Sequence, residues 1–189
     1  MGQMSVTHGV ILAGGAGRRI GGDKATRRLA GRPLWTHVAG RLTGQLGTLA
    51  ANGVTLGDLP VVADIHPALG PLSGIHASMV WAAGQGASYV LTVAVDTPFL
   101  PHDLAKRLAA AGGDIAVAQA TDGLQGTTAL WRTDLAEPLS AALTGGQRKV
   151  TDFANGHDLR PVLFADATPP PFFNINTVDD LAQAEAWLT

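Results

Sequence analysis

The sequence predicts an α/β fold, a three-layer α/β/α arrangement in which helices cover both faces of a mostly parallel sheet. Strand-like apolar runs alternate with helical runs along the chain, which is the pattern typical of such sheets. The length of 189 residues suits one domain, residues 1–189, with a substantial core. Apolar residues make up 46% of the chain and aromatic residues only 5%, so small aliphatic side chains are expected to fill that core.

Six apolar runs are expected to form the strands of a Rossmann-like sheet. In such sheets ligands bind beyond the carboxyl ends of the strands, so the residues that follow each run are the first candidates for a site. The predicted strands are His8–Leu12, 47–51, 60–63, 88–95, 114–118 and 127–131.

Five helical runs lie between and after these strands. Pro33 and Pro101 suit the first turn of a helix, where a missing backbone N–H costs nothing. Thr177 is expected to cap the last helix, with Asp180 three residues later as its partner in a capping box. The predicted helices are 33–45, 72–83, 101–111, 134–143 and 177–187.

Composition excludes several classes of function. The formal net charge of −2, without a basic stripe, argues against a nucleic-acid partner. The chain has no cysteine, which excludes disulfides, cysteine-zinc sites and thiol catalysis. No apolar stretch approaches the ~20 residues of a membrane span, and residues 1–7 lack the regions of a signal peptide. We therefore expect a cytoplasmic protein that has no membrane partner.

A glycine-rich, cationic loop follows the first predicted strand. Residues 10–24 read V-I-L-A-G-G-A-G-R-R-I-G-G-D-K and place Arg18, Arg19 and Lys24 among the glycines. Because glycine has no Cβ, the backbone N–H groups of such a loop can approach an anion closely. The loop therefore predicts a site for a polyphosphate.

This loop does not match two familiar phosphate-binding motifs. A P-loop requires G-x-x-x-x-G-K-[ST], whereas Gly22 is followed by Asp23. The dinucleotide fingerprint requires a small residue at the position where this chain has Ile20. Asp23 therefore excludes the P-loop, and Ile20 excludes the dinucleotide fingerprint.

Three polar residues follow predicted strands and are candidates for the ligand site. Asp96 ends the most apolar run, 89–95, where a poorly solvated carboxylate would suit Mg²⁺, a hard ion that takes carboxylate and phosphate oxygens. Its alternative role is a turn residue that caps the helix after Pro101. Asn52 and Asp64 follow the second and third strands and can face the same crevice, although both residue types are also ordinary turn formers.

The opening segment resembles the opening motif of the nucleotidyltransferases. Residues 12–24, L-A-G-G-A-G-R-R-I-G-G-D-K, continue into G-R-P-L-W-T-H-V at 31–38, and together they are similar to the molybdenum cofactor guanylyltransferases, the MobA family. The resemblance extends from about Val10 to Leu181. In one departure, Gly22 directly precedes Asp23 where the family often has an intervening residue.

The resemblance implies a Mg²⁺-dependent guanylyltransferase. Such an enzyme transfers GMP from GTP to the phosphate of molybdenum-molybdopterin, which forms the molybdopterin guanine dinucleotide cofactor and releases pyrophosphate. The implied partners are GTP, molybdenum-molybdopterin, and molybdoenzymes or other proteins of the cofactor pathway. A phosphate nucleophile with a second pKa near ~6 is already ionised at neutral pH, so no general base is needed.

The resemblance also implies roles for individual residues. Lys24, Arg18 and Arg19 would neutralise phosphate charge during catalysis, and Asp96, within V-D-T-P-F, would hold Mg²⁺. Small residues in 70–74, G-P-L-S-G, would let a flat base or ribose lie close to the backbone, and polar strand-end residues would contact guanine or ribose. The implied nucleotide-binding residues are Leu12, Ala13, Gly14, Gly15, Lys24, Asn52, Asp64 and Asp96.

Two features nearer the C-terminus are implied in binding the pterin. Residues 173–177, F-N-I-N-T, resemble the family's N-x-N-T element, in which neutral Asn174 and Asn176 suit an acceptor that already carries phosphate charge. Arg148 and Lys149 would supply countercharge for that phosphate. The alternative for these two cations is a solvated face.

Other functions stay as alternatives at this point. They are a molybdopterin cytidylyltransferase, a sugar-phosphate nucleotidyltransferase and a non-catalytic carrier of the pterin cofactor. Gly14-Gly15, where cytidylyl relatives usually have Ala-Gly, and the N-x-N-T element favour guanylyl transfer. Lys24 and Asp96 argue against a carrier.

Overall fold

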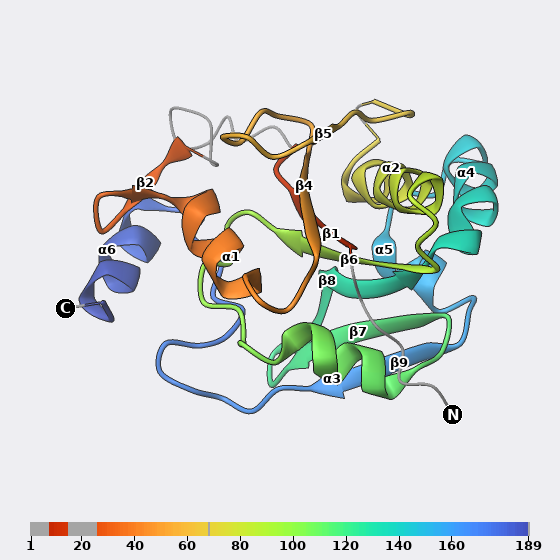
Figure 1. Cartoon of the computed structure of the whole chain (residues 1–189). Helices are drawn as coiled ribbons and strands as arrows, with labels where there is room; N and C mark the ends of the chain where they lie inside the picture. Colours follow the sequence, from red (N-terminus) through yellow and green to blue (C-terminus); the bar gives the residue numbers. More distant parts are fainter. Residues whose placement is uncertain (1–7, 15–25, 68, 189) are drawn as a thin grey trace.

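A seven-stranded sheet runs through the centre of the computed structural model, which describes residues 8–14, 26–67 and 69–188 (Figure 1). Its strands are β1 (His8–Leu12), β4 (Thr48–Asn52), β5 (Val61–Val62), β6 (Tyr89–Ala94), β7 (Ile115–Ala120), β8 (Gly123–Arg132) and β9 (Leu159–Leu163). They lie in the order β5-β4-β1-β6-β8-β7-β9. Every pairing in this sheet is parallel except those of β8. The predicted mostly parallel sheet is therefore confirmed.

Helices cover both faces of this sheet (Figure 1). The helices are α1 (Leu34–Leu42), α2 (Pro71–Gly84), α3 (Leu104–Ala111), α4 (Ala136–Thr144), α5 (Val150–Ala154) and α6 (Val178–Ala186), and a 3₁₀ turn, η3 (Thr133–Leu135), precedes α4. Side chains alternate between faces along a strand. In β1, Ile11 joins the apolar cluster under α1 and α3, whereas Val10 and Leu12 join the cluster under α2, α4 and α5. The predicted three layers follow from this alternation.

A smaller apolar cluster lies beside the sheet and joins distant parts of the chain. A hairpin of β2 (Arg28–Leu29) and β3 (Arg32–Pro33) packs near α6 (Figure 1). The buried members of this cluster are Leu29, Leu34, Phe99, Ile175 and Ala184. The C-terminal helix therefore lies against the segments that follow the glycine-rich loop and β6.

The structure confirms one predicted helix end and corrects another. Thr177 caps α6 as expected, since its side chain accepts a hydrogen bond from the Asp180 N–H while the Asp180 carboxylate accepts one from the Thr177 N–H. Pro33 ends β3 and immediately precedes α1. The expectation for Pro101 was wrong, because α3 begins at Leu104 and Pro101 lies in the turn before it.

The sequence analysis missed the β2–β3 hairpin, α5 and β9. The hairpin strands have two residues each and α5 has five, so none is long enough to display a periodic pattern. Strand β9 lies at the edge of the sheet, where Arg160 and Pro161 interrupt its apolar character. Within the described ranges, every helix is too short or too polar to cross a bilayer.

A buried hydroxyl links β6 to β8 and gives the first prediction. Thr92 accepts a hydrogen bond from Trp131 Nε1 at 2.8 Å and donates one to the Thr127 carbonyl at 2.9 Å. We expect Thr92→Val to lower the free energy of unfolding by about 1–3 kcal/mol, because valine keeps the shape but leaves the buried indole N–H without its acceptor. Urea-induced unfolding followed by circular dichroism measures this loss.

Thr144→Val in α4 is the matched control. Thr144 is exposed and donates to the Ser140 carbonyl at 3.0 Å, so its replacement leaves no buried group unsatisfied. The free energy of unfolding of this variant should change by no more than about 0.5 kcal/mol. Equal losses in the two variants would contradict a structural role for the Thr92 hydroxyl.

Candidate active site

The carboxyl ends of three neighbouring strands are aligned at one edge of the sheet. Leu12, the last residue of β1, is in register with Asn52 of β4 on one side and with Ala94 of β6 on the other. The backbone continues this alignment beyond the strands, since the Leu12 carbonyl accepts from the Val95 N–H at 3.2 Å. The start of the glycine-rich loop and Asp96 therefore leave adjacent strands on the same edge.

Asn52 is the buried polar centre of this edge. Only 2% of the residue is exposed, and its Nδ2 donates to the Val62 carbonyl at 3.0 Å and to Asp64 Oδ1 at 2.8 Å. A buried amide needs such partners, and here they tie the ends of β4 and β5 together. The structure thus brings Asn52 and Asp64 into contact, as their shared position at strand ends predicts.

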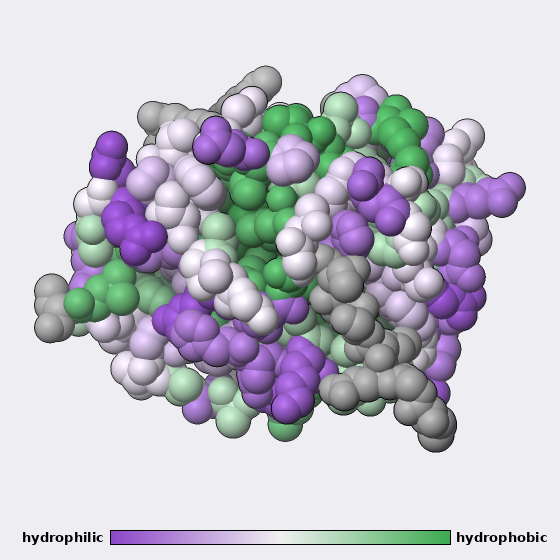
Figure 2. Space-filling model, viewed as in Figure 1, coloured by the Kyte–Doolittle hydropathy of each residue, from purple (hydrophilic) through white to green (hydrophobic). Residues whose placement is uncertain are grey.

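The rim of the site beside Asp64 is apolar. Ile65, the next residue, is 51% exposed, and Val61 of β5 is 52% exposed. Figure 2 shows apolar surface in the region of β4 and β5. A partly exposed carboxylate and an apolar surface therefore lie side by side at this end of the sheet.

Close backbone approaches explain why glycines surround Asn52. A Cβ on Gly74, in the second turn of α2, would lie 2.4 Å from Asn52 Oδ1. Gly53 has a φ of +82°, and a Cβ there would lie 3.0 Å from the Gly14 Cα. The segment G-P-L-S-G forms the cap and first turns of α2, with Gly70 as N-cap and Pro71 at the first helical position. Side chains larger than hydrogen at Gly74 or Gly53 would displace the Asn52 amide or the loop.

Asp96 stands at the end of β6. The residue is partly exposed, while its carboxylate oxygen Oδ1 is shielded from solvent. Thr97 Oγ1 donates to the Ala94 carbonyl at 2.8 Å and holds the turn in which Asp96 lies. The capping alternative is wrong, because the N-cap of α3 is Asp103.

The N-x-N element lies directly against Asp96. The Ile175 N–H donates to the Asp96 carbonyl at 2.9 Å, and Ile175 itself is fully buried. Asn174 and Asn176 flank this anchor, and both are exposed. The Asn176 N–H donates to Asp180 Oδ2 at 2.8 Å, which ties the element to the capping box of α6. The structure therefore joins two segments that are far apart in the sequence.

Arg148 and Lys149 lie between α4 and α5, on the side of the molecule away from α6 (Figure 1). Both are exposed, and Arg148 Nη1 donates to the carbonyls of Leu143 and Gln147 at the end of α4. Val150, which follows Lys149, lies close to β8, since a Cβ on Gly126 would lie 3.3 Å from its Cγ1. In the described part of the chain, none of the hydrogen bonds of Arg148 reaches the N-x-N element. These bonds favour the alternative interpretation, in which Arg148 lies on a solvated face.

The structure covers only part of the expected phosphate cradle. Leu12, Ala13 and Gly14 are described, and the Ala13 N–H donates to the Asn52 carbonyl at 3.3 Å. Gly15, Arg18, Arg19 and Lys24 lie outside the described residues. The described ranges hold no group of three or more histidine, aspartate or glutamate side chains that could bind a metal ion.

Sequence reasoning missed two residues that shape this edge. Ile175 was passed over because it is an apolar residue between two candidate asparagines, and only the fold reveals its bond to Asp96. Gly53 was also missed, although the dipeptide Asn52-Gly53 is a recognisable signal for a turn with positive φ. No local sequence pattern pointed to Ile175, whereas the Asn-Gly dipeptide pointed to Gly53.

Comparison with known proteins agrees with this architecture. The family model for the MobA-like NTP transferase domain matches residues 9–159. A molybdenum cofactor guanylyltransferase from Cereibacter sphaeroides is 48% identical, with 95% of this chain and 96% of the relative covered. Another, from Rhizobium leguminosarum bv. trifolii (strain WSM2304), is 44% identical over 95% of this chain and 92% of the relative.

A solved structure has the same fold over nearly its whole length. Molybdopterin-guanine dinucleotide biosynthesis protein A from Archaeoglobus fulgidus superposes with a TM-score of 0.77 and 25% identity, and the match covers 95% of this chain and 97% of that chain. The family match spans most of the sheet, including the three aligned strand ends. The chain therefore belongs to the family of MobA-like NTP transferase domains.

Proposed function

We propose that this chain transfers GMP from GTP to the terminal phosphate of molybdenum-molybdopterin. An oxygen of that phosphate attacks the α-phosphorus of GTP, the bond from the α-phosphorus to the β-phosphate oxygen breaks, and pyrophosphate leaves. The observation that carries the proposal is the convergence of Gly14, Asn52 and Asp96 on one edge, in a chain 48% identical to a relative of that name. The acceptor phosphate is ionised near neutral pH, so the site needs no general base.

The nucleotide side of the proposed site is the part formed by β1, β4 and β5. The backbone of Leu12–Gly15 would cradle the nucleotide, and the cations Arg18, Arg19 and Lys24 would neutralise its phosphates. The Asn52–Asp64 pair would face the base or ribose, with the apolar rim at Ile65 beside it. Rigid strand ends hold these groups before the substrate arrives, which lowers the entropic cost of aligning it.

Asp96 would hold Mg²⁺. The donor set fits this hard ion, which is commonly bound by one or two carboxylates together with substrate phosphate oxygens. The carboxylate lies at the end of a buried strand and has one oxygen shielded from solvent, where a cation would offset the cost of burying its charge. When bound, the ion supplies neutralisation of phosphate charge.

The acceptor side is the N-x-N element. Asn174 and Asn176 are exposed beside the anchor at Ile175, so their amides can meet a ligand without rearrangement of the core. Neutral amides add no negative charge to a place where a phosphate must approach.

The substrate is tested by comparing nucleotides. We expect GTP with Mg²⁺ and molybdenum-molybdopterin to release pyrophosphate at a rate at least about tenfold above CTP or ATP, a discrimination that one good polar contact to the base can supply. A pyrophosphate-release assay measures the rates, and isothermal titration of each nucleotide with and without Mg²⁺ measures binding. Preference for CTP would make the chain a cytidylyltransferase, and pterin binding without pyrophosphate release would make it a carrier.

The role of Asp96 is tested by Asp96→Ala. We expect turnover to fall by at least about a hundredfold, as removal of a group that stabilises phosphate charge does in other active sites. Folding should survive, because a partly exposed strand-end carboxylate adds little to the core. Asp103→Ala is the matched control, since Asp103 follows closely in the chain and makes no side-chain cap to α3. Normal turnover by Asp96→Ala would overturn its assignment.

The role of Asn52 is tested through Gly74. We expect Gly74→Ala to raise the KM for GTP by about tenfold, because its Cβ would lie 2.4 Å from Asn52 Oδ1 and push the amide out of place. Gly84→Ala, at the end of the same helix, is the control because a Cβ there meets nothing within 4 Å. A KM for GTP equal in the two variants would show that the Asn52 position does not matter for nucleotide binding.

A further inference from the structure

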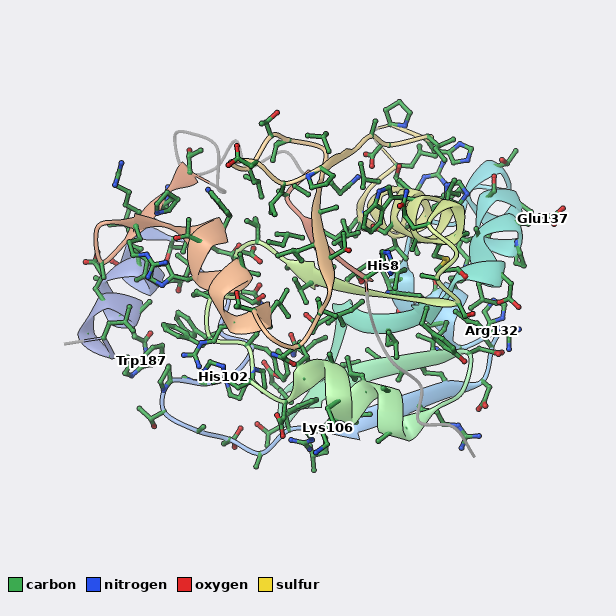
Figure 3. The ribbon with its side chains drawn as sticks, in the orientation of Figure 1. His8, His102, Lys106, Arg132, Glu137 and Trp187 are labelled. Atoms are coloured by element: carbon green, nitrogen blue, oxygen red, sulfur yellow. The ribbon has the colours of Figure 1, made fainter. Side chains whose placement is uncertain are left out.

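Trp187 packs edge-on against aromatic rings from two segments of the proposed site. Its ring centroid lies 4.9 Å from that of Phe173 with an interplanar angle of 85°, and 5.8 Å from that of Phe99 with an angle of 77°. Edge-to-face geometry of this kind is the attractive arrangement for aromatic pairs. Phe173 directly precedes Asn174, and Phe99 follows Asp96 by three residues. Trp187, the C-cap of α6 (labelled in Figure 3), therefore contacts both segments of the proposed site.

The two segments are restrained to different degrees without this contact. The segment with Asp96 continues a central strand, and the Thr97 hydroxyl and the buried ring of Phe99 hold the turn that follows. The asparagine segment is anchored at Ile175 by its bond to the Asp96 carbonyl. On the Phe173 side of this anchor, however, Asn174 is exposed, and its Nδ2 reaches the Phe172 carbonyl only at 3.4 Å. Loss of the Trp187 ring should therefore loosen the asparagine segment more than the aspartate segment.

The contact lies outside the part of the chain that the family model matches. The family model matches residues 9–159, whereas Phe173 and Trp187 come later in the chain. The family model alone therefore gives no role to α6. The small cluster of Leu29, Phe99 and Ile175 shows that this helix nevertheless packs against the segments that carry the site.

We propose that Trp187 is a positioning residue for the acceptor. By packing against both Phe173 and Phe99, it fixes Asn174 relative to Asp96 and so sets the approach of the acceptor phosphate. The inference rests on the proposed function, because it concerns the second substrate of that reaction. Small displacements at such a place matter, since a misplacement of about 1 Å can reduce a rate by about a hundredfold.

The test compares Trp187→Ala with Trp81→Ala. Trp81 is also a partly buried tryptophan with one edge-on partner, His8 at 5.5 Å, but His8 begins β1 and thus lies at the opposite edge of the sheet (Figure 3). We expect Trp187→Ala to raise the KM for molybdenum-molybdopterin by about tenfold and to leave the KM for GTP within about twofold. Trp81→Ala should change neither constant, and Trp187→Phe should restore most of the acceptor KM because it keeps an aromatic ring.

The KM values of these variants decide whether Trp187 positions the acceptor. An acceptor KM in Trp187→Ala no higher than in Trp81→Ala, or an equal rise in both substrate constants, would overturn the positioning role. Should Trp187→Ala fail to fold, Phe173→Leu removes the same contact from the other side and must produce the same split between the two constants. Absence of guanylyl transfer by the unmodified protein would overturn the proposed function itself, whereas an active protein indifferent to Trp187→Ala would overturn only this inference.

Discussion

The parallel pairing of β1 with β4 and with β6 is the constraint on which the site depends. It places Leu12 in register with Asn52 and with Ala94, so three strand ends come to one edge. Register in a buried sheet is firmly specified, because a slip of one residue would turn Val10 and Leu12 from one core to the other. The same packing that stabilises the sheet therefore also sets the relative positions of the candidate groups.

At these strand ends, the buried side-chain amide of Asn52 both stabilises the sheet and orients a candidate site residue, Asp64. The Asn52 side-chain N–H groups donate to the β5 backbone and to Asp64, and its side-chain oxygen lies against Gly74 of α2. An amide in such surroundings has little freedom to move, because an unsatisfied buried donor is costly. Asp64 is oriented by this contact. A ligand that met Asp64 would therefore meet a group already held in place.

Strand-end residues could be predicted from the sequence, but contacts between distant segments could not. Asp96 and Asn52 are recognisable because an apolar run that stops at a polar residue is a local pattern, and parallel strands bring such residues together. The hydrogen bond from Ile175 to Asp96 has no local signature. Arg148 illustrates a second limit, since an exposed cation and a ligand-binding cation look alike in sequence until the partners at the end of α4 are known. Elements as short as α5 leave no periodic pattern at all.

A transfer reaction between two substrates requires that their sites be fixed relative to one another as well as individually. In the proposed reaction the nucleotide side would be built from strand ends in the first half of the chain, whereas the acceptor side would be the loop that enters α6. The backbone bond from Ile175 to Asp96 is the direct link between them, and the apolar cluster with Phe99 and Ala184 surrounds that link. The residues that flank Ile175 are the neutral Asn174 and Asn176, so in the proposed reaction they would add no negative charge where two phosphates approach. The C-terminal helix, which lies beyond the residues that the family model matches, therefore packs directly against the segments that carry the candidate site.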